Sequence, residues 1–223
     1  WAIMYPQYVL RAVLCACSAT QTPWQIAISE AQRQSIFRDP LWHDGYYSLE
    51  RAPDDGLSIA RMNAMVWYRS PVAYEAKFGR ATRTPLRRAA SDDDSFEVEC
   101  YLEHQGAKFV RRFDANCYVA LTQTLDSHDV GRGRGSVDEV LASIRQCVTV
   151  VGVTSDMLYP LYLQRELADK IPLGTLRVVE SDQGHDAFLL ETSVVSAYVA
   201  EALDDGLELV HCAVLDPDGY DAP

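Results

Sequence analysis

The 223-residue sequence lacks the features that define several classes of protein. No apolar run approaches the roughly 20 residues that span a bilayer, so we expect no membrane-spanning helix and no membrane partner. Lys and Arg number 20 against 32 Asp and Glu, and the net charge of −12 argues against nucleic acid as a partner. The composition, 48% hydrophobic and 23% charged, excludes a disordered chain, a collagen-like repeat and a coiled-coil rod.

Closely spaced cysteine pairs are also missing. The six cysteines form no CxxC motif, and four of them lie in apolar stretches such as the one that ends at Cys15. This placement is typical of buried free thiols in a reducing compartment, so we expect a cytoplasmic protein without a disulfide framework. We expect no metal site either, because the spacing of His128 between Asp126 and Asp129 gives no complete ligand set.

The sequence begins at Trp1 rather than at a methionine. Its first six residues have no basic region and do not form a signal peptide. They are typical of the end of a helix that is stopped by Pro6. We therefore expect the first element to be cut and the sequence to be a fragment.

Strand patterns lie towards both ends of the chain, and helix patterns fill its middle. Residues 9–18 and 147–153 are β-branched, apolar runs, as in the buried strands of a parallel sheet. After the second run the patterns are those of a helix, a strand and a helix, at residues 160–170, 176–180 and 189–203. This βαβ order predicts that residues 1–20 and 138–223 form one α/β sheet. Residues 21–137 are predicted to form a mostly helical insertion.

Two candidate catalytic residues follow two of these predicted strands. Asp156 comes just after the strand that ends at Val153, and His185 follows the next strand in Gly184-His185-Asp186. Ligands and catalytic groups gather at the carboxyl ends of parallel strands. An acid and then a histidine is the order of a Ser–Asp–His triad, in which the acid orients the imidazole and the histidine is the general base. Asp156 could instead cap the next helix, and His185 could be an ordinary loop histidine.

A serine for this triad is not recognisable in the sequence. The nucleophile is expected in a G-x-S-x-G elbow that precedes the acid and the histidine. Neither Ser136, which follows a glycine, nor Ser155, which precedes Asp156, has this context. We therefore expect the nucleophile and further strands upstream of Trp1, and we expect the 223 residues alone to be inactive.

Eight short segments, ordered and well spaced, carry a specific pattern. They are SEAQRQSI (29–36), DPLW (39–42), GLSIARM (56–62), KFGR (77–80), RFDANCY (112–118), LDSHD (125–129), SD (155–156) and GHDAFLLE (184–191). Over residues 1 to about 203 the sequence resembles the homoserine O-acetyltransferase family in its fungal form. The fungal enzyme that acetylates deacetylcephalosporin C is similar over the same stretch.

The resemblance implies a partial α/β-hydrolase core with an inserted helical lid, in agreement with the division at residues 20 and 138. It also implies a ping-pong reaction of methionine biosynthesis, in which a serine takes acetyl from acetyl-CoA and passes it to L-homoserine. Acetyl-CoA is then a co-substrate, and no cofactor is expected. The family further suggests a homodimer formed through the lid, and an N-terminal half as a partner of this chain.

The resemblance assigns roles to five residues. Asp156 and His185 would be the acid and the base of the triad. Arg61 would bind the carboxylate of homoserine, since a guanidinium pairs bidentately with a carboxylate. Asp186 would hold the amino group of homoserine. Tyr68, two turns along the helix from Arg61, would line the acyl tunnel.

Less specific interpretations stay open for several of these residues. By pattern alone, Arg61 could form a surface ion pair, Asp186 could cap a turn and Tyr68 could be a core residue. A group of arginines could attract the phosphates of coenzyme A, although a solvated loop is the better interpretation: Arg80, Arg83, Arg87 and Arg88. For the whole chain, the alternatives are another hydroxyl acceptor, or a non-catalytic fragment that serves as a dimerisation module.

Overall fold

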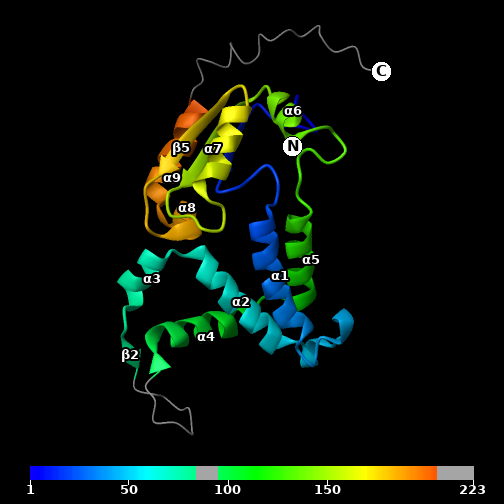
Figure 1. Cartoon of the computed structure of the whole chain (residues 1–223), viewed down its shortest axis with the longest axis vertical. Coiled ribbons are helices and arrows are strands. Elements are labelled where there is room, and N and C mark those ends of the chain that lie inside the picture. Colours follow the sequence, from blue (N-terminus) through cyan, green and yellow to red (C-terminus); the bar gives the residue numbers. More distant parts are fainter. Residues whose placement is uncertain (84–94, 205–223) are drawn as a thin grey trace. The chain divides into compact units, whose positions relative to one another are not determined.

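A computed structural model describes residues 1–83 and 95–204 (Figure 1). The chain forms two compact units. We call the first the sheet unit; it comprises Trp1–Thr20, Asp129–Ser181 and the described chain from Asp186 on. The second, which we call the helical unit, comprises Gln21–His128 and Asp182–His185. The helical unit thus begins at the residue expected for the insertion, but residues 129–137 belong to the sheet unit.

Among the described residues, three parallel strands form the sheet in the order β1-β4-β5: Arg11–Cys15, Cys147–Val153 and Gly174–Val179. The central strand, β4, is an almost continuous apolar run, because a strand with neighbours on both edges and helices on both faces meets little water. Its side chains alternate between two clusters. Val148 and Val150 pack with Leu167 of α7 (Leu161–Lys170), while Val151 and Val153 pack with Val179 and the helices after β5.

The remaining elements of the sheet unit are short helices and one longer one. They are α6 (Val137–Ala142), the 3-10 turn η3 (Gly184–Asp186), which begins in the helical unit, α8 (Ala187–Leu190) and α9 (Thr192–Asp204). The sheet with flanking helices confirms the predicted α/β class.

Within the described residues, five helices and a small hairpin form the helical unit. The helices are α1 (Pro23–Phe37), α2 (Asp54–Tyr68), α3 (Pro71–Phe78), α4 (Glu97–Val110) and α5 (Ala115–Asp126). The hairpin pairs β2 (Thr82–Arg83) with β3 (Ser95–Phe96), and two 3-10 turns, η1 (His43–Gly45) and η2 (Leu49–Arg51), connect α1 to α2. Helix α2 packs against both α1 and α4, and α1 lies beside α5 (Figure 1).

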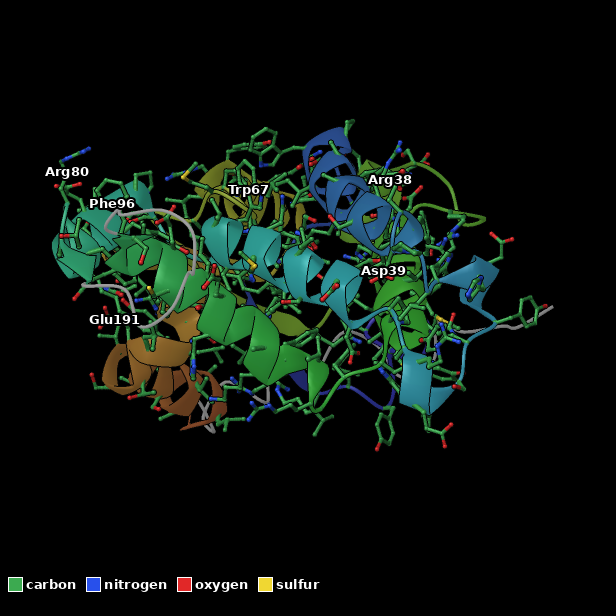
Figure 2. The ribbon with its side chains drawn as sticks, turned by 90° about the horizontal axis from the view of Figure 1, so that it is seen from below. Arg38, Asp39, Trp67, Arg80, Phe96 and Glu191 are labelled. Carbon is green, nitrogen blue, oxygen red and sulfur yellow. The ribbon has the colours of Figure 1, made fainter. Side chains whose placement is uncertain are left out.

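Local sequence explains where these helices begin and how closely two of them approach. Pro71 starts α3 and Ser70 caps it, since its hydroxyl accepts the N–H of Ala73 at 3.0 Å. Asp39, two residues after the end of α1, accepts the N–H of Gly56 of α2 at 2.7 Å; Figure 2 labels Asp39. A Cβ on Gly56 would lie 2.8 Å from the Cα of Ile36, so only glycine permits this approach of α2 to α1.

Four cysteines are free thiols as predicted and one is not, but none of the four is fully buried as expected, since three are half-buried and Cys117 is exposed. Cys15, Cys17, Cys100 and Cys117 are free thiols. Burial raises the pKa of Cys17 to about 11, and the neighbouring Cys15 adds to this. Cys147 is disulfide-bonded, so the prediction of free thiols is wrong at this residue. It lies half-buried at the start of β4, and the missing CxxC motif behind the prediction says nothing about a bond between cysteines that are far apart in the chain.

Residues 1–83 and 95–204 contain neither a membrane-spanning helix nor a metal-binding cluster. None of their helices combines the length and apolarity that crossing a membrane requires. No group of three or more His, Cys, Asp or Glu side chains among them could hold a metal ion.

Candidate active site

Asp156 lies in the turn that follows β4 in the sheet unit. Its side chain is buried, with 4% of the residue exposed. The Oδ1 atom accepts the backbone N–H of Leu158 at 2.9 Å and that of Tyr159 at 2.7 Å, which compensates for burying a polar group. Helix α7 begins only at Leu161, so Asp156 organises the turn before this helix and does not cap it.

The turns after β4 and β5 are joined to each other within the sheet unit. Ser155 donates its hydroxyl to the carbonyl oxygen of Ser181 at 2.5 Å. The N–H of Thr154 donates to the carbonyl oxygen of Val179 at 3.1 Å. These hydrogen bonds fix the backbone of the turn around Asp156. The turn lies at the carboxyl edge of the sheet, where the catalytic groups of parallel sheets gather.

His185 follows a segment that is seated on the junction of α2 and α3 within the helical unit. Ser70 donates its hydroxyl to the carbonyl oxygen of Asp182. Arg69 Nη2 donates to Gln183 Oε1 at 2.7 Å. These two hydrogen bonds tie the segment before His185 to two consecutive residues of the junction. They therefore restrict the position of the backbone from which the His185 side chain projects.

Gly184 makes this seating possible. Its φ is +73°, in the left-handed region, and a Cβ would lie 2.6 Å from the backbone C of Arg69 and the backbone N of Ser70. Any other residue would therefore be strained and would also collide with backbone atoms, which cannot rotate away.

Tyr68 and Arg61 lie beside this histidine on α2. The ring centroids of Tyr68 and His185 are 6.1 Å apart, with the planes tilted by 38°. The guanidinium carbon of Arg61 lies 5.3 Å from the centroid of the Tyr68 ring. Two helical turns separate Arg61 from Tyr68, which places them on one face as predicted. The helical unit thus brings together three of the five predicted site residues.

Asp186 and Asp156 belong to the sheet unit. Asp186 is adjacent to His185 in the chain and occupies the N-cap position of α8. Its side chain makes no capping hydrogen bond to this helix.

Sequence reasoning missed two aromatic residues of the helical unit, Phe109 of α4 and Tyr118 of α5. The guanidinium carbon of Arg61 lies 4.9 Å from the Phe109 ring centroid. The ring of Tyr118 meets that of Phe109 edge to face at 5.9 Å. In the sequence both look like ordinary core residues at helical spacing, and only the packing of α4 and α5 against α2 brings them to Arg61.

Of the predicted arginine group, Arg80 is exposed and lies with its guanidinium carbon 5.2 Å from the Phe96 ring centroid (Figure 2). Arg87 and Arg88 lie outside the described residues. A pocket of about 270 Å³ opens nearby on α3 and α4, and none of the five predicted site residues lines it: Phe78, Glu97, Cys100, Tyr101 and His104.

Comparisons with known proteins agree on a fold and on a group of relatives. A family profile described as "alpha/beta hydrolase fold" matches residues 1–192. The homoserine O-acetyltransferase of Salinibacter ruber is 47% identical over 193 residues, covering 86% of this chain and 53% of the relative. That of Trichormus variabilis is 45% identical over 199 residues, covering 89% and 53%. The chain thus spans about half the length of the curated relatives it matches.

Solved structures also include homoserine O-acetyltransferases among the similar proteins. The homoserine O-acetyltransferase of Staphylococcus aureus superposes with a TM-score of 0.66 at 31% identity, covering 90% of this chain and 53% of that one. The enzyme of the same name from Bacillus anthracis gives a TM-score of 0.82 at 20% identity over 92% and 56%, which shows the shared fold alone. The resemblance drawn from the sequence motifs is confirmed, but these relatives are bacterial and do not support the prediction of a fungal form.

Proposed function

Because the chain belongs to the alpha/beta hydrolase fold family, and because its relatives are homoserine O-acetyltransferases, we propose that it is the C-terminal portion of such an enzyme. The whole protein would transfer acetyl from acetyl-CoA to L-homoserine, a step of methionine biosynthesis. The observation that carries the proposal is the grouping of Arg61, Tyr68 and His185 in the helical unit.

The proposed reaction has two acyl transfers with His185 as the shared base. In the first, His185 takes the proton of a serine hydroxyl, and the serine oxygen attacks the thioester carbonyl. The C–S bond breaks, and coenzyme A leaves as a thiol with the proton from the imidazolium. In the second, His185 takes the hydroxyl proton of homoserine, whose oxygen attacks the acetyl-serine ester. The serine then leaves and recovers a proton from the imidazolium.

Asp156 is proposed to orient the imidazole of His185 and to stabilise its charged form. Its burial and its two backbone donors support this role, because they fix the carboxyl group after β4. The serine is proposed to come from a part of the protein outside this chain. Two facts support this: no serine of the sequence has a G-x-S-x-G context, and the chain spans about half the length of its relatives.

Arg61 is proposed to bind the carboxylate of homoserine. Within the described residues it has no ion-pair partner, although two aromatic rings lie against its guanidinium. A guanidinium that stacks through its face keeps its N–H edge available for a bidentate carboxylate. Asp186, next to the base in the chain, is proposed to hold the ammonium group, and Tyr68 to line the acyl site.

The resemblance alone supports three further proposals: a cytoplasmic location, a homodimer through the helical unit, and an N-terminal half as the partner of this chain.

The proposal is tested by supplying the missing half. The chain is mixed with the N-terminal part of the Salinibacter ruber relative that it does not cover, and O-acetylhomoserine is measured by mass spectrometry. His185→Ala should abolish product, since general-base catalysis alone contributes about 10²–10⁴-fold. The matched control is His104→Ala, which removes an exposed histidine of the same unit and should leave the rate unchanged. Normal turnover by the His185→Ala protein would refute the assignment of the base.

A further inference from the structure

We infer that Phe109 and Tyr118 are positioning residues for Arg61: they hold its guanidinium in place for the acceptor's carboxylate. They thereby favour acceptors that carry a carboxylate in addition to the reacting alcohol. The inference rests on the proposed function, because it gives Arg61 the same ligand.

The Arg61 guanidinium is held by rings from two different helices. Its carbon lies 5.3 Å from the Tyr68 centroid, on its own helix, and 4.9 Å from the Phe109 centroid, on α4. Both distances are within the roughly 6 Å at which a cation is attracted to an aromatic face. An arginine side chain has many rotamers, so two neighbouring rings restrict where its N–H groups can point.

The ring of Phe109 packs against Tyr118, which a buried hydrogen bond holds in place. Tyr118 stands edge-on to Phe109, at 5.9 Å with an interplanar angle of 85°, and is only 7% exposed. Its hydroxyl donates to Gln32 Oε1 of α1 at 2.6 Å, and Gln32 is itself buried. The series of packed side chains therefore runs from α1 through Tyr118 and Phe109 to Arg61.

Tyr118 interacts electrostatically with both Arg61 and Tyr68. Burial raises the pKa of Tyr118 well above its ordinary value, and the nearby Tyr68 adds to this, while Arg61 and Arg33 oppose it. The phenol therefore stays protonated and continues to donate to Gln32. Because its hydroxyl is engaged in this way, Tyr118 affects a substrate through Arg61 and not by direct contact.

The test compares two acceptors in the chain complemented with the N-terminal part of the Salinibacter ruber relative. L-Homoserine carries the carboxylate, and homoserinol has a hydroxymethyl group in its place. The attraction between a partly buried cation and one aromatic ring corresponds to about 5- to 20-fold in affinity. Phe109→Leu should therefore raise KM for homoserine by that factor, with kcat little changed. Tyr118→Phe keeps its ring and loses only the hydroxyl that donates to Gln32, so it should raise this KM by a smaller factor. Their kcat/KM for homoserinol should stay at the parent value, so that the preference for homoserine falls.

Two controls separate positioning from general damage. Arg112→Gln removes the second cation at the Phe109 ring, 5.1 Å from its centroid, and should keep the preference for homoserine. Tyr47→Phe removes a different hydroxyl of the same unit, the one that donates to Asp114 at 2.7 Å, and should keep it as well. Equal losses for both acceptors, or no loss for either, would overturn the inference.

A second measurement needs no activity. In the 223-residue chain, the Nε–H resonance of Arg61, identified by its loss in Arg61→Lys, should be shifted upfield by the rings. Phe109→Leu should move it towards the ordinary arginine position, and an unmoved resonance would refute the positioning role. A complemented parent protein that transfers no acetyl to either acceptor would refute the proposed function. The resonance would then still decide whether Phe109 holds Arg61.

Discussion

Replacing Gly184 by alanine tests how the segment before His185 is held. The new methyl group would lie 2.6 Å from two backbone atoms of the α2–α3 junction, the C of Arg69 and the N of Ser70. Atoms of a backbone cannot move aside as the end of a side chain can. The segment, which is also tied down by Ser70 and Arg69, must therefore shift or detach.

The cost of Gly184→Ala has two parts. A left-handed φ costs an L-residue about 1–2 kcal/mol. Forcing an extra methyl group into packed surroundings costs a further ~1–3 kcal/mol. Gly133→Ala separates the two, because Gly133 has nearly the same φ, +72° against +73°, but has nothing within 4 Å of its Cβ position. Gly133→Ala should therefore show only the first part.

Urea unfolding of the two variants measures this difference. Gly184→Ala should lower the free energy of unfolding by about 1–3 kcal/mol more than Gly133→Ala does. In the chain complemented with the N-terminal half, it should also slow acetyl transfer by about 10²-fold, because a shift of about 1 Å at a catalytic group has that effect. A Gly184→Ala protein as stable and as active as the Gly133→Ala protein would refute the reasoning.

Two further predictions concern the helical unit. Asp126→Asn breaks a 2.6 Å ion pair with Arg33, whose side chain is 6% exposed, and should cost about 3–5 kcal/mol in urea unfolding. Glu30→Gln removes a more exposed partner of the same arginine, and a loss above ~1 kcal/mol there would contradict this account. Burial, with the hydrogen bond to Asp114, raises the pKa of Tyr47 to about 12. A raised folded pKa stabilises the fold below the unfolded value of about 10, and this stability is lost as pH rises through about 12. Tyr47→Phe should therefore flatten the alkaline unfolding profile between these values, and an unchanged profile would show that Tyr47 does not titrate there.

Those parts of the fold that depend on local pattern could be read from the sequence. The run 147–153 predicts a buried central strand because both of its faces need apolar side chains. The spacing of Arg61 and Tyr68 predicts a shared face of one helix, and their contact in α2 confirms it. The turn around Asp156 was less predictable, because a helix cap and a pre-helical turn use the same residue type.

What the sequence could not reveal depends on contacts between distant residues. Phe109 follows Arg61 by 48 positions, and nothing in the helical spacing of α4 marks it as a partner of an arginine. The seating of Asp182–His185 on Arg69 and Ser70 likewise joins residues more than 110 positions apart. Such contacts depend on how α2, α3 and α4 pack against one another. The local spacing of residues in the sequence does not predict that packing.

The release of free thiol from acetyl-CoA in the presence of homoserine tests the central claim most directly. It is followed for the purified chain alone, for the N-terminal half of the Salinibacter ruber relative alone, and for the two together. We predict release only from the mixture, because the proposal assigns His185 and Asp156 of this chain to the triad and places the serine outside it. Release from the chain alone, or no release from a mixture shown to form a folded complex, would contradict the account.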